Sequence, residues 1–115
     1  MTGNGKKEPL KKKINKAIKK FQNIRAEIER RLVTGQVSEL YQYPMKFHPL
    51  HDEYYAIENE YAELFNIHYA EMDKRYPMFL IDEDTKKNIV RRILEILTLI
   101  DKMIENLENM MYSIP

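Results

Sequence analysis

The segment LKKKINKAIKKFQNIRAEI, residues 10–28, decides the fold. Its apolar residues recur at spacings of 4, 3, 4, 3 and 4, at Leu10, Ile14, Ala17, Phe21, Ile24 and Ile28. This spacing places them on one side of an α-helix, as at the a and d positions of a coiled coil. Pro9 suits the start of such a helix and Gly35 suits its end. The pattern predicts a helix over about residues 10–33 that buries one side against partner helices.

Two further amphipathic segments predict the other helices. One covers about residues 49–75, and its apolar row consists of Leu50, Tyr54, Ile57, Tyr61, Leu64, His68 and Met72. The other covers about residues 84–112 and carries two overlapping rows. The first row is Val90, Ile93, Leu97, Ile100, Ile104, Leu107 and Met111, and the second is Ile89, Ile93, Ile96, Ile100, Met103, Leu107 and Met110. Because a helix with two apolar rows faces two partners, the third helix is expected to lie between the others.

These elements predict an all-α fold, an antiparallel three-helix bundle. Residues 1–8 are small or polar and are expected to form a disordered basic arm, and residues 9–115 a single helical domain. The connector at residues 35–48 is too apolar to lie in water, so it is expected to pack across the bundle. A short turn of helix is expected within it, around Val37–Tyr41.

The composition excludes several classes of site and location. The chain has no cysteine, which excludes disulfides, zinc–thiolate sites and cysteine nucleophiles. No apolar run approaches the roughly 20 residues that a membrane span needs. The basic N-terminal segment is not followed by the apolar stretch of a secretory signal. We therefore expect a cytoplasmic protein without a membrane span.

Charge is distributed unevenly along the chain, although the net charge is only +1. Residues 1–25 hold nine Lys and Arg against one acid, Glu8, whereas residues 51–85 hold ten acids against Lys74 and Arg75. The lysines of the first segment fall outside its apolar row and are Lys6, Lys7, Lys11, Lys12, Lys13, Lys16, Lys19 and Lys20. Such an asymmetry indicates an electrostatic partner.

The lysines have two interpretations. They can contact the phosphates of DNA or RNA, which releases counterions and gives affinity that depends on salt rather than on sequence. Alternatively they can lie beside the acidic segment at residues 51–85, in the same chain or in a second copy. The basic segment contains only one aromatic residue, Phe21, and therefore offers no stacking surface of its own.

No pattern in the sequence predicts catalysis. His48 and His51 have a spacing that metal sites use, but Pro49 interrupts the pair and the ligand set is incomplete. His68 lies in the apolar row of the second helix, where a hydrogen-bonded core histidine is expected. There is no glycine-rich phosphate loop and no serine nucleophile motif. We therefore predict no enzyme activity, catalytic residue, metal site, cofactor or small-molecule substrate.

The resulting functional hypothesis is a non-catalytic helical interaction protein that self-associates, with a dimer as the first expectation. The surface expected to hold the copies together consists of Leu94, Leu99, Met103 and Met110. The alternative hypothesis is a nucleic-acid-binding protein that uses the lysine-rich segment.

Overall fold

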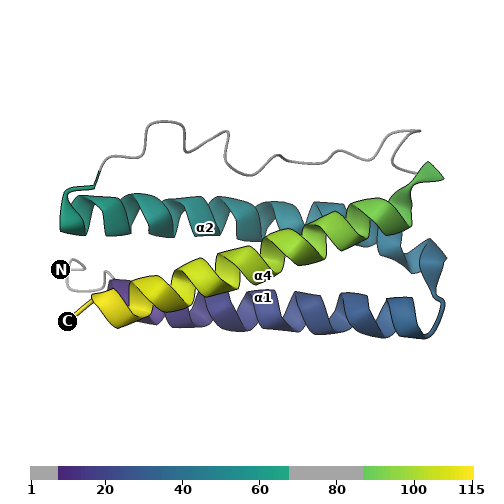
Figure 1. Ribbon diagram of the computed structural model, residues 1–115, viewed down its shortest axis with the longest axis horizontal. Coiled ribbons are helices and arrows are strands. Elements are labelled where there is room, and N and C mark those ends of the chain that lie inside the picture. The colour runs from purple at the N-terminus through teal and green to yellow at the C-terminus, as the bar shows by residue number, and fades with distance from the viewer. Residues whose placement is uncertain (1–7, 68–86) are drawn as a thin grey trace.

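The computed structural model describes residues 8–67 and 87–115. These residues form α1 (Leu10–Val33), the 3-10 helix η2 (Val37–Gln42), α2 (Tyr43–Phe65) and α4 (Ile89–Ser113). The three α-helices pack against one another, with α1 in extensive contact with both others (Figure 1). The three-helix bundle expected from the sequence is therefore confirmed. Of the expected N-terminal arm, only Glu8 lies within the described residues.

Helix α1 follows the sequence prediction closely. Its buried side chains are the expected ones with Ile18 added, and Leu10 is partly buried. The helix ends at Val33, two residues before Gly35, which has a φ of 74°. There the amide of Gln36 donates to the carbonyl of Arg31 at 2.9 Å, and the amide of Gly35 donates to the carbonyl of Leu32 at 3.3 Å. This pair of bonds is a Schellman motif, which needs a left-handed residue such as glycine at this position.

Helix α2 begins at Tyr43, six residues before the expected start at Pro49. The expectation treated Pro49 as the start of the helix, and this was wrong. Pro44 stands in the first turn, where an amide hydrogen has no intrahelical partner to lose. Pro49 lies inside the helix and has no amide hydrogen to donate to the carbonyl of Met45, four residues earlier. Both residues are exposed. The short helical turn expected in the connector is present as η2.

Helix α2 ends at Phe65 rather than near residue 75. Asn66 adopts the left-handed conformation, with a φ of 55°. The amide of Ile67 donates to the carbonyl of Ala62 at 2.8 Å and that of Asn66 to Glu63 at 3.3 Å, a second Schellman motif. Asparagine tolerates this conformation better than other residues except glycine, so Asn66 was the overlooked stop signal. The expected helical residues 68–75 lie outside the described residues. The third helix was expected from about residue 84, and α4 begins at Ile89.

The buried side of α2 is confirmed in part. Tyr54 and Ile57 of the expected row are buried, Leu50 and Tyr61 are partly buried against the core, and Leu64 is exposed. Phe47, His51 and Glu58 are buried as well and were not expected there. Phe47 lies before the expected start of the helix, and His51 and Glu58 are polar, so the expected row did not include them.

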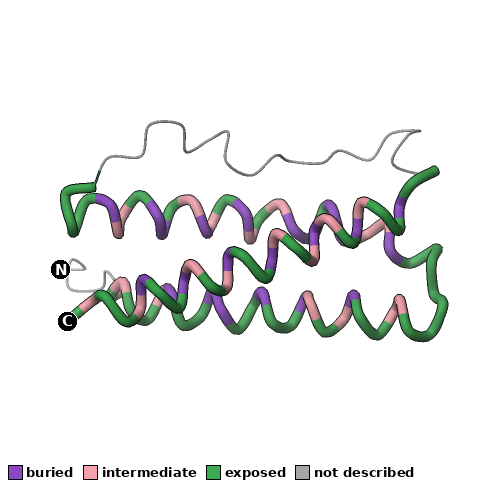
Figure 2. Tube along the Cα trace, in the orientation of Figure 1, coloured by how far each residue is buried: buried purple, intermediate pink, exposed green. Residues whose placement is uncertain are grey.

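Helix α4 buries the second of its two expected rows, from Ile89 to Met110. The first row is only partly buried, and its first member, Val90, is exposed. In Figure 2 the buried positions of all three helices lie where the helices face each other, and the exposed positions lie outward. The core is thus formed by one row of side chains from each helix together with Leu40 of η2.

The direction of α4 differs from the regular alternation of the antiparallel bundle that the sequence predicted. Helix α4 is antiparallel to α1 and parallel to α2 (Figure 1). Two side-chain contacts join α4 to its neighbours in this arrangement. Arg25 of α1 binds Asp101 of α4 at 2.5 Å, and Asn106 of α4 donates to the hydroxyl of Tyr54 on α2 at 2.9 Å. The chain between Phe65 and Ile89 is long enough to traverse the bundle, which lets α4 start from the same end as α2.

The core predicts a sharp contrast between two positions of α1. Phe21 is fully buried, with its ring centroid 6.3 Å from that of Phe47, whereas Val33 is 85% exposed. We expect Phe21→Ala to lower the free energy of unfolding by about 3–5 kcal/mol through lost contacts and a cavity. Val33→Ala should change it by less than about 0.5 kcal/mol. Urea denaturation followed by circular dichroism measures both, and equal effects of the two substitutions would contradict this core.

Candidate functional site

Three ion pairs join α1 to α2 along one flank of α1. Lys13 binds Glu60 at 2.8 Å, Lys20 binds Glu53 at 3.1 Å, and Glu27 lies 3.8 Å from Lys46. The positions are seven residues apart on both helices, so each pair lies two turns from the next. Part of the lysine-rich segment therefore pairs with the acidic segment of the same chain, as one interpretation predicted. We call Lys13 and Lys20 the paired lysines.

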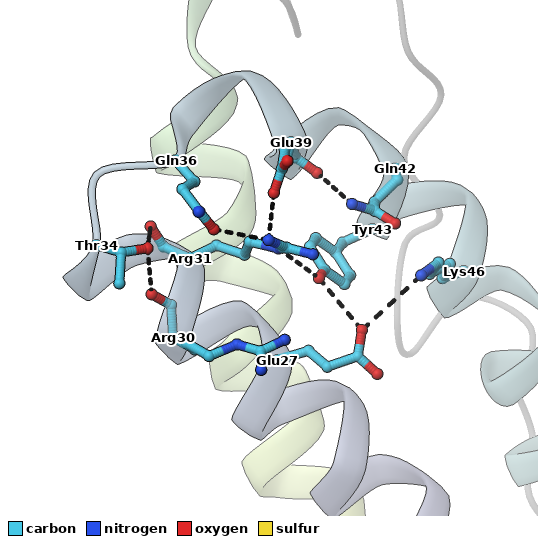
Figure 3. Close-up of polar contacts among 9 residues, drawn as sticks. All are labelled: Glu27, Arg30, Arg31, Thr34, Gln36, Glu39, Gln42, Tyr43 and Lys46. Carbon is cyan, nitrogen blue, oxygen red and sulfur yellow. Dashed lines mark hydrogen bonds and ion pairs between the residues drawn. The ribbon is translucent and has the colours of Figure 1, made fainter.

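A polar network closes the corner where α1 turns through η2 into α2 (Figure 3). The buried Tyr43 hydroxyl donates to Glu27 at 3.2 Å and accepts from Nε of Arg31 at 3.4 Å. Nζ of Lys46 lies 5.3 Å from the centroid of the Tyr43 ring, within the range of a cation–π contact. The network fixes the antiparallel turn that brings α2 beside α1.

Arg31 links this corner to η2. Its guanidinium donates to Gln36 at 2.6 Å and forms an ion pair with Glu39 (Figure 3). The hydrogen bond with Tyr43 is the main cause that raises the pKa of Arg31, with the charges of Glu39 and Glu27 adding to it. Arg31 is therefore committed to the fold, unlike its neighbour Arg30, which is exposed and forms no ion pair with a described residue.

The side of α1 that points away from α2 and α4 carries cations and amides. We define this outward face by its residues, which all are exposed: Lys12, Asn15, Lys16, Lys19, Asn23, Ala26 and Arg30. It contains no acid, and it extends about 27 Å along the helix at 1.5 Å per residue. Within the described residues, Lys12, Lys19 and Arg30 form no ion pair.

The remaining lysines have different surroundings. Lys16 forms an ion pair with Glu8, and this hydrogen bond is the main cause that lowers the pKa of Glu8. Lys16 is exposed and Glu8 partly exposed, so the pair is weak and can exchange for another anion. Lys11 is exposed and lies on the flank of α1 nearer α4. Lys6 and Lys7 lie outside the described residues.

Two of the four residues expected at a self-association surface are in the core instead. Met103 is 0% exposed and Met110 is 5% exposed, because their row faces α1 and α2. A second copy cannot contact them while the bundle is closed. Leu99 is partly buried against the core, and Leu94 is 50% exposed. Only Leu94 and, in part, Leu99 remain accessible for the expected contact.

The structure also places an aromatic residue that the sequence interpretation overlooked. Tyr112 is 89% exposed, near the end of α4. It follows Asp101 by eleven residues, just over three full turns, so it lies on the same side of α4 about 16 Å further on. Because α4 is antiparallel to α1, and Asp101 binds Arg25, this position is level with the lysine-rich segment. Figure 1 shows the end of α4 beside the start of α1. Only the direction of α4, which the sequence did not give, reveals this proximity.

A second overlooked residue is Glu58, which is buried in α2. The hydroxyl of Tyr54 donates to Glu58 at 2.9 Å and accepts from Asn106 of α4 at 2.9 Å. Buried polar groups need such partners, so the chain of bonds aligns α2 with α4. The position of Glu58 four residues after Tyr54, on the same helical side, was the available signal.

The candidate ligand residues for a metal do not come together. His51 is buried between aromatic rings, with centroids 5.9 Å from Phe47 and 4.6 Å from Tyr55. Within residues 8–67 and 87–115, no group of three or more histidine, aspartate or glutamate side chains is placed to hold a metal ion. In the same residues, no helix combines the length and apolar character that crossing a bilayer requires.

No protein-family model, curated protein or solved structure gives a significant match to this chain. Its function is therefore inferred from the geometry of its own surfaces.

Proposed function

We propose that this protein is a non-catalytic helical binding protein that contacts the phosphates of nucleic acid through the outward face of α1. The observation that carries the proposal is the division of the cations of α1. Those on the α2 flank are paired within the chain, whereas Lys12, Lys19 and Arg30 face solvent without a described carboxylate partner. A binding role of this kind requires an intracellular location, as the sequence predicts.

The chemistry of the outward face suits a phosphate backbone. Each lysine that meets a phosphate releases condensed counterions, which makes binding favourable at low salt. Asn15 and Asn23 lie between the cations and supply amide donors, which also bond to phosphate oxygens and sugars. Glu8, which pairs with Lys16, is a described acid beside this face, and no internal ion pair of Lys12 or Lys19 must be broken first.

An anionic membrane surface fits the outward face less well. Helices that lie on membranes combine cations with a row of large apolar residues that enters the lipid. Apart from Val33 at its last position, the large apolar residues of α1 are turned into the bundle core, and the outward face has only Ala26. Attraction to lipid headgroups would thus be electrostatic alone.

Matched lysine substitutions test the proposal. We expect Lys12→Gln with Lys19→Gln to weaken binding of a 20-nucleotide strand or a 20-base-pair duplex roughly 25- to 60-fold at 0.1 M salt. This estimate takes one phosphate contact per lysine, about 5- to 8-fold each. The salt dependence of log K should also decrease, by about 1.4–1.8. Fluorescence anisotropy across a salt series measures both quantities.

The control carries the same change of charge on the same helix. Lys13→Gln with Lys20→Gln removes the paired lysines, whose exposed ion pairs contribute little to stability. Because the lost charges do not face the ligand, affinity should fall by less than about threefold. Equal losses in both variants would contradict the assignment of the outward face. Binding to anionic vesicles without binding to either oligonucleotide would refute the proposed function.

Self-association is a second candidate, favoured by the exposure of apolar side chains on α4. Val90 and Leu94 lie one turn apart and are both exposed, beside the partly buried Leu97. We propose that this short apolar row contacts a second copy of the chain.

Light scattering after gel filtration tests this candidate. We expect a dimer at tens of micromolar that becomes a monomer on Leu94→Lys, because the substitution buries a charge in the contact. Val33→Lys introduces the same charge at an exposed site of α1 and should leave the dimer intact. A monomeric unmodified chain at this concentration would exclude the candidate.

A further inference from the structure

The solvent side of α4 carries its charges in an order that the helix dipole does not favour. Arg91 is exposed in the first turn, where the dipole favours an acid, and this turn holds none. Glu105 and Glu108 are exposed in the second half of the helix, and the last turn holds no basic residue. The dipole of α4 therefore does not account for this distribution of charge.

The same three charges form no ion pair within the described residues. The ion pairs that α4 forms there are those of Asp101 and of Arg92. Lys102 is exposed too, but it lies four residues before Asn106, which bonds to Tyr54, and so it is on the flank toward α2. One end of the solvent side of α4 is thus positive and the other negative.

A helix with this polarity is complementary to a second copy of itself that runs in the opposite direction. Arg91 and Glu105 lie seven residues, or about two turns, on either side of Thr98. At about 100° per residue, Arg91, Leu94, Thr98 and Glu105 fall within an arc of about 60°, and all four are exposed. A twofold axis at Thr98 would therefore set Arg91 of each copy opposite Glu105 of the other, because the same two positions meet twice in such a contact.

We propose that two copies of the chain associate through α4, antiparallel and with the twofold axis at Thr98. This inference rests on the self-association proposed above and adds the arrangement of the copies. Leu94, which is 50% exposed, lies between Thr98 and Arg91, so the apolar side chains occupy the middle of the contact and the charges its rim. A parallel contact would instead oppose Arg91 to Arg91 and Glu105 to Glu105, which is unfavourable.

Charge reversal at the two positions tests this arrangement. Arg91→Glu and Glu105→Arg, each alone, oppose like charges at both symmetric contacts, so each should raise the dissociation constant of the dimer about 5- to 30-fold at low salt. An equimolar mixture of the two variants opposes unlike charges at both contacts, and should recover the dissociation constant to within about threefold. Light scattering after gel filtration over a concentration series measures these values.

The folding of α4 should tolerate both substitutions. Arg91→Glu places an acid in the first turn, where the dipole favours it, and Glu105→Arg retains a strong helix former. Lys12→Glu makes the same change of charge on α1 and is the control, with an expected dissociation constant within about twofold of that of the unmodified chain.

Cross-linking tests the position of the axis independently, because the chain has no cysteine. Thr98→Cys places the two thiols at the axis, whereas Glu105→Cys places them fourteen residues, or about 21 Å, apart along the antiparallel helices. A bis-maleimide of much shorter span should link the first variant into a covalent dimer and leave the second as a monomer. Linking of both variants alike, or of neither, would refute the arrangement.

The outcomes separate this inference from the self-association on which it rests. If the unmodified chain is monomeric at tens of micromolar, both fail. If the unmodified chain is a dimer that Arg91→Glu leaves intact, or if the mixture of variants dissociates as readily as each variant alone, the antiparallel α4 contact is refuted. Self-association in another arrangement would then remain.

Discussion

The antiparallel pairing of α1 with α2 is the constraint on which the rest of the structure depends. Burial of the apolar row of α1 stabilises the pair, because apolar surface removed from water contributes about 25 cal/mol per Å². The ion pairs Lys13–Glu60, Lys20–Glu53 and Glu27–Lys46 are all accessible to solvent in part, so each contributes little energy. Their seven-residue spacing and their change of sign at the third pair disfavour a shifted register, because a shift would oppose like charges.

This pairing also determines which cations can bind a partner. The same helix has one flank whose lysines are held by α2 and one face whose cations meet only solvent. The corner network around Tyr43 keeps that division in place by fixing the turn between the helices. Helix α4 then completes the core, running in the same direction as α2. Fold and proposed binding surface thus follow from one arrangement.

The sequence was informative where one rule dominates and misleading where two compete. The spacing of apolar residues in α1 and the glycine at its end gave that helix almost residue by residue. In α2, Pro49 was taken as a boundary because proline disrupts helix interiors, yet its exposed position tolerates the lost hydrogen bond. Asn66 ends the helix through its backbone conformation, and an apolar pattern that continues past it gives no sign of that.

The candidate site shows the same limit. Periodicity separated the lysines from the core of α1, but it could not tell which of them α2 would neutralise. It also assigned Met103 and Met110 to a surface. The two apolar rows of α4 are similar in sequence, and only the packing of α1 and α2 determines that the row with Met103 and Met110 is buried. The proximity of Tyr112 to α1 depends on the direction of α4, which is a property of the assembled bundle and not of any local pattern.

Chemical-shift mapping with a 12-nucleotide single strand tests the central claim most directly. On titration of the labelled protein at low salt, we expect the largest shifts in the side-chain Cε–Hε signals of Lys12 and Lys19. The Cε–Hε signals of the paired lysines should move little. Largest shifts at Lys13 and Lys20, with the outward face unchanged, would contradict the division of cations on which the account rests.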